Sequence, residues 1–202
     1  MWLPCQYGHT MFFSMHATFS STFPLRPARV HEVYGAGAIA FAAIVATGAC
    51  PWIRESWHAD TLAPQGLLPF CDPTQFLLAR PKDQTDALAV AEEALKGGAL
   101  PFVILEITHP LNFREGRRLQ LAAKAGETTG LCLIPEGMGS NAAETRWRAT
   151  PVFDAQNHHA AREDSTLMRW EIKKNKSGTI GVWNVRWNSK TRRVHVVSPS
   201  GE

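Results

Sequence analysis

Residues 29–44 read RVHEVYGAGAIAFAAI, and this stretch decides which fold the sequence predicts. A short β-prone run containing Val30, Val33 and Tyr34 stops at two glycines, and an alanine-rich helical run follows directly. This is the strand, tight turn and helix of a phosphate-binding α/β fold. An ordinary βα turn that contains glycines is also consistent with this sequence. The rest of the chain is needed to distinguish the two interpretations.

The chemistry of a phosphate loop is missing from this turn. Such a loop reads G-x-x-x-x-G-K followed by Ser or Thr, and its backbone amides and lysine hold the phosphates. Counted from Gly35, the second glycine position is Ala40, the lysine position is Phe41 and the hydroxyl position is Ala42. The run is apolar all round, which predicts a buried helix. Under the phosphate-loop interpretation, these positions and Gly37 are the degenerate remnant of a nucleotide site.

Length and composition favour a folded α/β domain. The chain has 202 residues, of which 45% are hydrophobic and 19% charged, and this balance argues against a disordered chain. The net charge of +3 is unevenly distributed. Residues 162–202 carry nine Lys/Arg and four Asp/Glu, a charge of +5, whereas the remainder carries twelve and fourteen, a charge of −2. No apolar run approaches the ~18 residues that span a membrane, so we expect a cytoplasmic protein.

The cysteines show neither CxxC pairing nor clustered spacing, which favours buried free thiols in a reducing compartment over disulfides. A zinc site is favoured less, since the pair His158-His159 has no cysteine near it in the sequence. We therefore expect no metal. The cysteines are Cys5, Cys50, Cys71 and Cys132.

The domain organisation predicted is a short N-terminal segment followed by one α/β domain. Residues 1–28 show no helical or strand period and no signal-peptide pattern, and Met11 and Met15 are alternative starts. We expect this segment to be poorly ordered or mis-assigned. Residues 29–202 are the domain, with 162–202 as its basic antiparallel hairpin end.

Periodicity predicts alternating strands and helices that give way to antiparallel strands. The parallel part is expected to contain strands at 50–54, 75–80, 102–105 and 131–134 and helices at 55–62, 85–96 (capped by Thr85) and 112–125. A strand at 145–150 and three antiparallel strands at 167–173, 181–187 and 193–197 follow.

With these elements in order, the chain resembles RecA, and more closely the ImuA family of RecA-like mutagenesis proteins. The similarity spans about residues 29–197. It rests on the order and spacing of five motifs: HEVYG at 31–35, FVILE at 102–106, RRLQLAA at 117–123, AETRW at 143–147 and KNK at 174–176.

The resemblance implies a RecA-like three-layer domain with a mostly parallel central sheet and antiparallel C-terminal strands. It also implies a bacterial accessory protein of the DNA-damage (SOS) response that supports error-prone translesion synthesis. Its partners would be a Y-family-like polymerase homologue, a replicative-type error-prone polymerase subunit, and by extension RecA or DNA at the nucleoid. With Phe41 at the lysine position, neither catalysis nor a cofactor is expected. Two alternatives stay open: an ATP-dependent DNA-binding protein with a divergent nucleotide site, and a cell-division inhibitor similar to SulA.

The resemblance also implies roles for particular residues. Glu106 matches the acidic strand end that helps to place magnesium in RecA, and Glu55 lies near the position of the catalytic glutamate. The loop at 135–143 matches the DNA-binding loop of RecA but contains no Lys, Arg or aromatic residue, which argues against RecA-style binding of single strands.

Contacts with DNA or a partner are instead expected from basic residues elsewhere. In the run Arg146-Trp147-Arg148, an edge strand with an inward tryptophan is an equally good explanation. Two patches are predicted, one on the helix at 112–125 and one at the C-terminal hairpins. The candidates are Arg114, Arg117, Arg118, Arg146, Arg148, Lys174, Lys176, Arg192 and Arg193, with Lys124 and Lys173 beside them.

Overall fold

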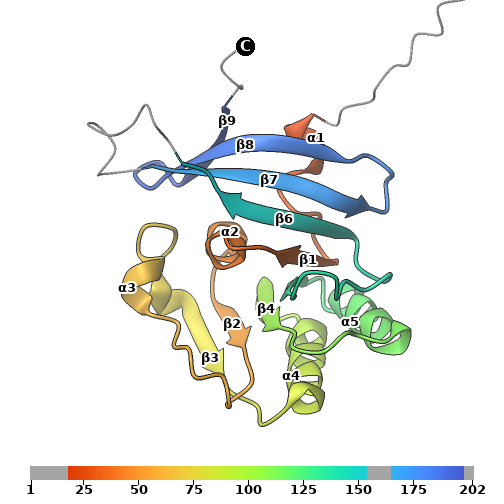
Figure 1. Ribbon diagram of the computed structural model, residues 1–202. Coiled ribbons are helices and arrows are strands. Elements are labelled where there is room, and N and C mark those ends of the chain that lie inside the picture. Colours follow the sequence, from red (N-terminus) through yellow and green to blue (C-terminus); the bar gives the residue numbers. More distant parts are fainter. Residues whose placement is uncertain (1–17, 154–164, 198–202) are drawn as a thin grey trace, which may run out of the picture.

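A nine-stranded sheet organises the computed structural model, which describes residues 18–153 and 165–197 (Figure 1). The strand order is β3-β2-β4-β5-β1-β6-β7-β8-β9. Neighbouring strands pair in parallel from β3 to β6 and antiparallel from β6 to β9. The prediction of a mixed α/β fold with antiparallel C-terminal strands is confirmed. The strands are β1 (Val30–Tyr34), β2 (Cys50–Ile53), β3 (Phe76–Ala79), β4 (Phe102–Glu106), β5 (Thr129–Leu133), β6 (Thr145–Pro151), β7 (Ser165–Asn175), β8 (Gly181–Asn188) and β9 (Arg193–Val197).

Helices cover both faces of the parallel part of the sheet. The helix α2 packs on the face that carries Val33 and Trp147, whereas α4 and α5 pack side by side on the opposite face, which carries Val30 and Tyr34 (Figure 1). The continuous apolar runs of β4 and β5 follow from this arrangement, because both faces of these strands are buried. The helices are α1 (Phe19–Thr22), α2 (Ala38–Val45), α3 (Pro64–Leu67), α4 (Gln84–Gly97) and α5 (Phe113–Ala125), with a 3-10 turn, η1 (Pro73–Gln75).

The ends of the two long helices follow capping chemistry. Asn112 accepts a hydrogen bond from the backbone N–H of Glu115 at 3.0 Å, and the Glu115 carboxylate accepts one from the backbone N–H of Asn112 at 2.8 Å, forming a capping box for α5. The cap predicted for α4, Thr85, is wrong. Asp83 caps that helix by accepting from the backbone N–H of Asp86 at 2.9 Å, since Asp, two residues earlier, is a stronger N-cap than Thr. Gly98 ends α4 with a φ of 67°.

The helix predicted at 55–62 is absent from the described structure. Tertiary contacts hold this segment in a non-helical path. The backbone N–H of Ser56 donates to the carbonyl oxygen of Pro81 at 2.7 Å, and the carboxylate of Glu55 accepts hydrogen bonds from the side chains of Thr108 and Trp57. Thr108 and Pro81 lie in other connections of the fold, so no local sequence pattern predicts these two contacts.

The antiparallel strands have an aromatic core that extends to the N-terminal helix. Trp170 of β7 lies between Phe41 on α2 and Phe23, with ring centroids 4.6 Å and 5.4 Å away. Phe19 of α1 stacks on Phe23 at 5.0 Å and meets Trp183 of β8 at 5.5 Å. Residues 18–28 therefore pack on the domain, ahead of the boundary predicted at residue 29. Residues 1–17, with Met11 and Met15, lie outside the described residues.

Three cysteines, Cys50, Cys71 and Cys132, are buried free thiols, as predicted. Burial raises the pKa of Cys50 to about 12 and that of Cys71 to about 11, so both stay protonated near neutral pH. Cys5 and the pair His158-His159 lie outside the described residues.

Candidate functional site

The glycine turn between β1 and α2 packs against β6. Gly37 donates its backbone N–H to the carbonyl oxygen of Ala149 at 2.9 Å. Gly35 adopts a φ of 98°, and a Cβ atom at this position would lie 2.6 Å from the same oxygen. A positive φ and a close backbone approach both require glycine. The glycines of the predicted phosphate loop therefore bring the turn onto β6.

The lysine position of the loop faces the core. Phe41 is 0% exposed, and its ring lies 5.6 Å from Trp147 and 4.6 Å from Trp170 between centroids. Ala42 is buried as well, and Ala40 is half-buried against the same core. The predicted helix is present, but it is buried on one side only, since Ile39 in its first turn is 48% exposed. Ala40, Phe41 and Ala42 do not face an open site.

The two carboxylates predicted near this site are engaged by other side chains. Glu106, at the end of β4, accepts a hydrogen bond from the indole N–H of Trp52 at 2.7 Å and lies 3.4 Å from the guanidinium of Arg54. Glu55 is buried and accepts the indole N–H of Trp57 at 2.6 Å. Both carboxylates thus support local packing at the carboxyl ends of the strands.

A cavity of about 380 Å³ remains at this edge, where open α/β sheets commonly bind ligands. Ile39 from the first turn of α2 and Trp57 line it and are exposed. Among the described residues of its lining there is no lysine or arginine. The cavity therefore lacks the cation that a phosphate site uses.

Polar side chains from β1, β6 and β7 bind the main chain of the short loop between β5 and β6. Glu32 of β1 is buried and accepts from the backbone N–H of Ser140 and from Nε of Arg146, both at 2.7 Å. Lys174 of β7 donates to the carbonyl oxygens of Asn141 and Ala143, also at 2.7 Å. Burial lowers the pKa of Lys174. The loop at 135–143 is thus fixed to the sheet by the described contacts.

Several predicted contact residues form ion pairs within the fold. Arg146 is tied to Glu32, and Arg118 of α5 forms an ion pair with Glu92 of α4. The edge-strand explanation for Arg146 and Arg148 is wrong, because β6 lies inside the sheet between β1 and β7. Arg148 lies 4.0 Å from Glu171, to which Lys173 is also paired.

The predicted basic patch at the C-terminal hairpins does not exist as one surface. Lys176 follows β7 in the turn to β8, whereas Arg192 and Arg193 lie at the turn from β8 to β9. Because Ile172 pairs with Gly181 and Asn188 pairs with Arg193, the two turns are at opposite ends of β8. Antiparallel pairing therefore separates Lys176 from Arg192 and Arg193, although these basic residues are close in the sequence.

The structure instead joins Lys176 to the helix patch. A groove of about 420 Å³ lies between α5 and the loop before β6. Arg117 and Lys124 of α5, Lys176 and Arg29 bring four positive charges to its lining. Arg114, on the same exposed helix surface, lies outside this lining. Sequence reasoning found three of these cations but missed Arg29, which precedes β1 and has no distinguishing local pattern.

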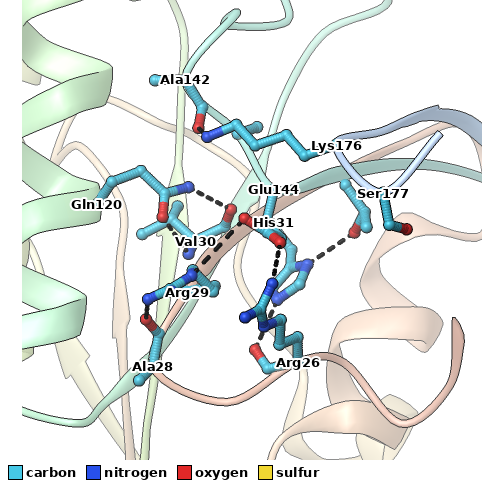
Figure 2. A network of polar contacts seen from close by, with 12 residues as sticks. Arg26, Ala28, Arg29, Val30, His31, Gln120, Ala142, Glu144, Lys176 and Ser177 are labelled. Carbon is cyan, nitrogen blue, oxygen red and sulfur yellow. Dashed lines mark hydrogen bonds and ion pairs between the residues drawn. The ribbon is translucent and has the colours of Figure 1, made fainter.

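A polar network shares several residues with the lining of this groove, among them Arg29, Gln120 and Glu144 (Figure 2). Arg26 donates to Glu144 at 2.9 Å, and Arg29 lies 3.7 Å from the same carboxylate. Next to them, His31 bonds the carbonyl oxygen of Arg26 at 2.9 Å and the Thr145 hydroxyl at 2.6 Å. Burial lowers the pKa of His31 to about 4, so the imidazole is neutral near pH 7.

Gln120 of α5 completes the network by binding the main chain of β1. Its amide group donates to the carbonyl oxygen of Val30 at 2.7 Å and accepts from the backbone N–H of Val30 at 3.2 Å. This contact fixes the helix to the strand and explains the glutamine of the RRLQLAA motif.

Within the described ranges 18–153 and 165–197, no three His, Cys, Asp or Glu side chains are grouped to hold a metal ion. The helices of those ranges are all too short or too polar to cross a membrane. Comparisons of the chain with protein-family models and with curated proteins returned no match.

Proposed function

We propose that this chain is a RecA-like accessory protein of the bacterial DNA-damage (SOS) response that works without a bound nucleotide. In this proposal the protein supports error-prone translesion synthesis by contacting a Y-family-like polymerase homologue and a replicative-type polymerase subunit. It acts in the cytoplasm, at the nucleoid. The family part of the proposal rests on the five motifs. The observation that carries the nucleotide-independent part is Phe41, which fills the lysine position with a ring buried against two tryptophans.

The order and direction of the strands support the RecA-like part of the proposal. The glycine turn after β1 and Glu106 at the end of β4 lie at the same edge of the sheet, because β1, β5 and β4 are parallel neighbours. A RecA-like core places its phosphate loop and its acidic strand end in this way. The engagement of Glu106 by Trp52 and Arg54 supports the loss of a magnesium role.

Titration calorimetry of the full chain with Mg·ATP tests the nucleotide-independent part. We expect no binding heat up to about 1 mM ATP, because lysine, hydroxyl and a free glycine loop supply much of the affinity of such sites. A dissociation constant in the low micromolar range would support the ATP-dependent alternative instead.

Affinity purification of the tagged full chain, from cells with and without ultraviolet damage, tests the functional part. We expect the polymerase partners to be enriched after damage, and deletion of the gene to lower damage-induced mutation frequency. Enrichment of cell-division proteins with unchanged mutagenesis would contradict the proposal and favour the inhibitor similar to SulA.

A further inference from the structure

We propose that the groove between α5 and the loop before β6 binds a partner-protein segment in which acidic side chains flank an apolar one. This groove is lined by Arg29, Phe113, Arg117, Leu121, Lys124 and Lys176, among others. The inference does not depend on the role in DNA damage, because it is drawn from the shape and charge of this surface alone.

The charge of the groove is positive and largely uncompensated. Its one lining carboxylate, Glu144, is held by Arg26 and Arg29. Among the described residues, no ion pair holds Arg117, Lys124 or Lys176. Lys176 donates to the carbonyl oxygen of Ala142 at 2.7 Å, which fixes its position without neutralising its charge (Figure 2). A ligand with carboxylates complements this surface.

Apolar side chains alternate with the cations along the same face of α5. Phe113 is 63% exposed and Leu121 is 56% exposed, and both line the groove. They are eight residues apart, or about 12 Å along a helix, and Arg117 lies midway between them. Exposed large apolar side chains gathered in a concave site mark a binding surface.

The combination favours a protein segment over a nucleic acid. A nucleic acid could use the cations for its phosphates and Phe113 for stacking, but Leu121 offers no ring on which a base can stack. A peptide that places an apolar side chain near Leu121 and carboxylates near Arg117 and Lys124 uses both the apolar and the cationic part of the lining. The groove volume of about 420 Å³ suits a few side chains.

The test begins with a phage library of random 12-residue peptides, selected on the immobilised full chain. Enriched peptides are synthesised with a fluorescein label, and their affinities are measured by fluorescence anisotropy at two salt concentrations. We expect enriched sequences with Asp or Glu around Leu, Phe or Trp, and weaker binding at the higher salt concentration.

Three variants locate the binding site. The double variant Arg117→Glu/Lys124→Glu should weaken binding by about tenfold or more, and Phe113→Ser/Leu121→Ser by about fivefold or more. The matched control Arg114→Glu reverses a charge on the same helix outside the groove lining and should change affinity by less than about twofold. Circular dichroism confirms that each variant is folded, as expected for exposed positions.

Two results would overturn the inference. One is a selection that yields no acidic apolar peptide, or peptides that keep their affinity in both groove variants. The other is a labelled 20-nucleotide thymidine strand that binds the wild-type chain and loses affinity in Arg117→Glu/Lys124→Glu, because the groove would then be a nucleic-acid site.

Discussion

Truncation of Phe41 measures how much this buried side chain contributes to the stability of the core. The side chain is fully buried and meets Trp147 and Trp170. Replacement of a buried phenylalanine by alanine costs about 3–5 kcal/mol of unfolding free energy, from lost transfer energy and the cavity left behind. For Phe41→Leu, which keeps most of the volume, we expect about 1–1.5 kcal/mol. Phe41→Lys should cost more than Phe41→Ala, because it places an ammonium group in an apolar core.

Equilibrium unfolding in urea, followed by circular dichroism, gives these differences, provided that the m-value stays constant. The matched control is Ile39→Ala on the same helix, at a side chain that is 48% exposed, and we expect a change within about 0.5 kcal/mol. A cost below about 1 kcal/mol for Phe41→Ala would refute the reasoning. So would a Phe41→Lys variant that folds normally and binds Mg·ATP.

Three further predictions concern the polar network, the loop and the N-terminal helix. The folded chain keeps His31 neutral down to about pH 4, whereas the unfolded chain takes up this proton near pH 6.5, so stability should fall as the pH is lowered between these values, by about 3 kcal/mol in total. His31→Asn should remove most of that dependence in urea titrations at pH 7 and pH 5; an unchanged slope would contradict the assignment. Glu32→Gln should cost about 2–3 kcal/mol, because Arg146 loses its charged partner, and an unchanged urea midpoint would show that the pair is dispensable. Phe19→Ala should cost about 1–2 kcal/mol, measured by thermal unfolding, because the ring is partly buried against Trp183; an unchanged melting temperature would mean that α1 contributes no stability.

The elements of the parallel half could be predicted because their signals are local. The apolar runs of β4 and β5 each depend on a few consecutive residues. The helix predicted at 55–62 is wrong because the conformation of this segment depends on partners distant in the sequence. Glu55 binds Thr108, and Ser56 binds Pro81. Such contacts override a weak helix propensity.

The candidate site could be predicted residue by residue but not as a surface. Arg117 and Lys176 are both predicted from the sequence as basic contact residues, and they are 59 positions apart. Only the pairing of β6 with β7 brings the turn that holds Lys176 to the side of α5. Conversely, Arg192 follows Lys176 closely in sequence yet lies at the other end of β8. Register decides these distances, and register is not a local property.

The motifs that carry the family resemblance contact one another in the fold. His31 and Glu32 of HEVYG bind Thr145 and Arg146 of AETRW, so two distant motifs meet across the β1–β6 pair. Gln120 of RRLQLAA binds the main chain just before HEVYG. The lysines of KNK bind the carbonyl oxygens of Asn141 and Ala142, just before AETRW, and of Ala143, its first residue.

Four of the five motifs therefore form one framework, which holds β1, β6, β7 and α5 together. The contacts of this framework do not depend on the residue at position 41, because the framework and a phosphate loop use different side chains. For this reason the order and spacing of the motifs predict the fold more strongly than any activity. The binding function has to be sought among side chains that the framework leaves exposed, and Arg117, Leu121 and Lys124 lie on the outward face of the helix that Gln120 anchors.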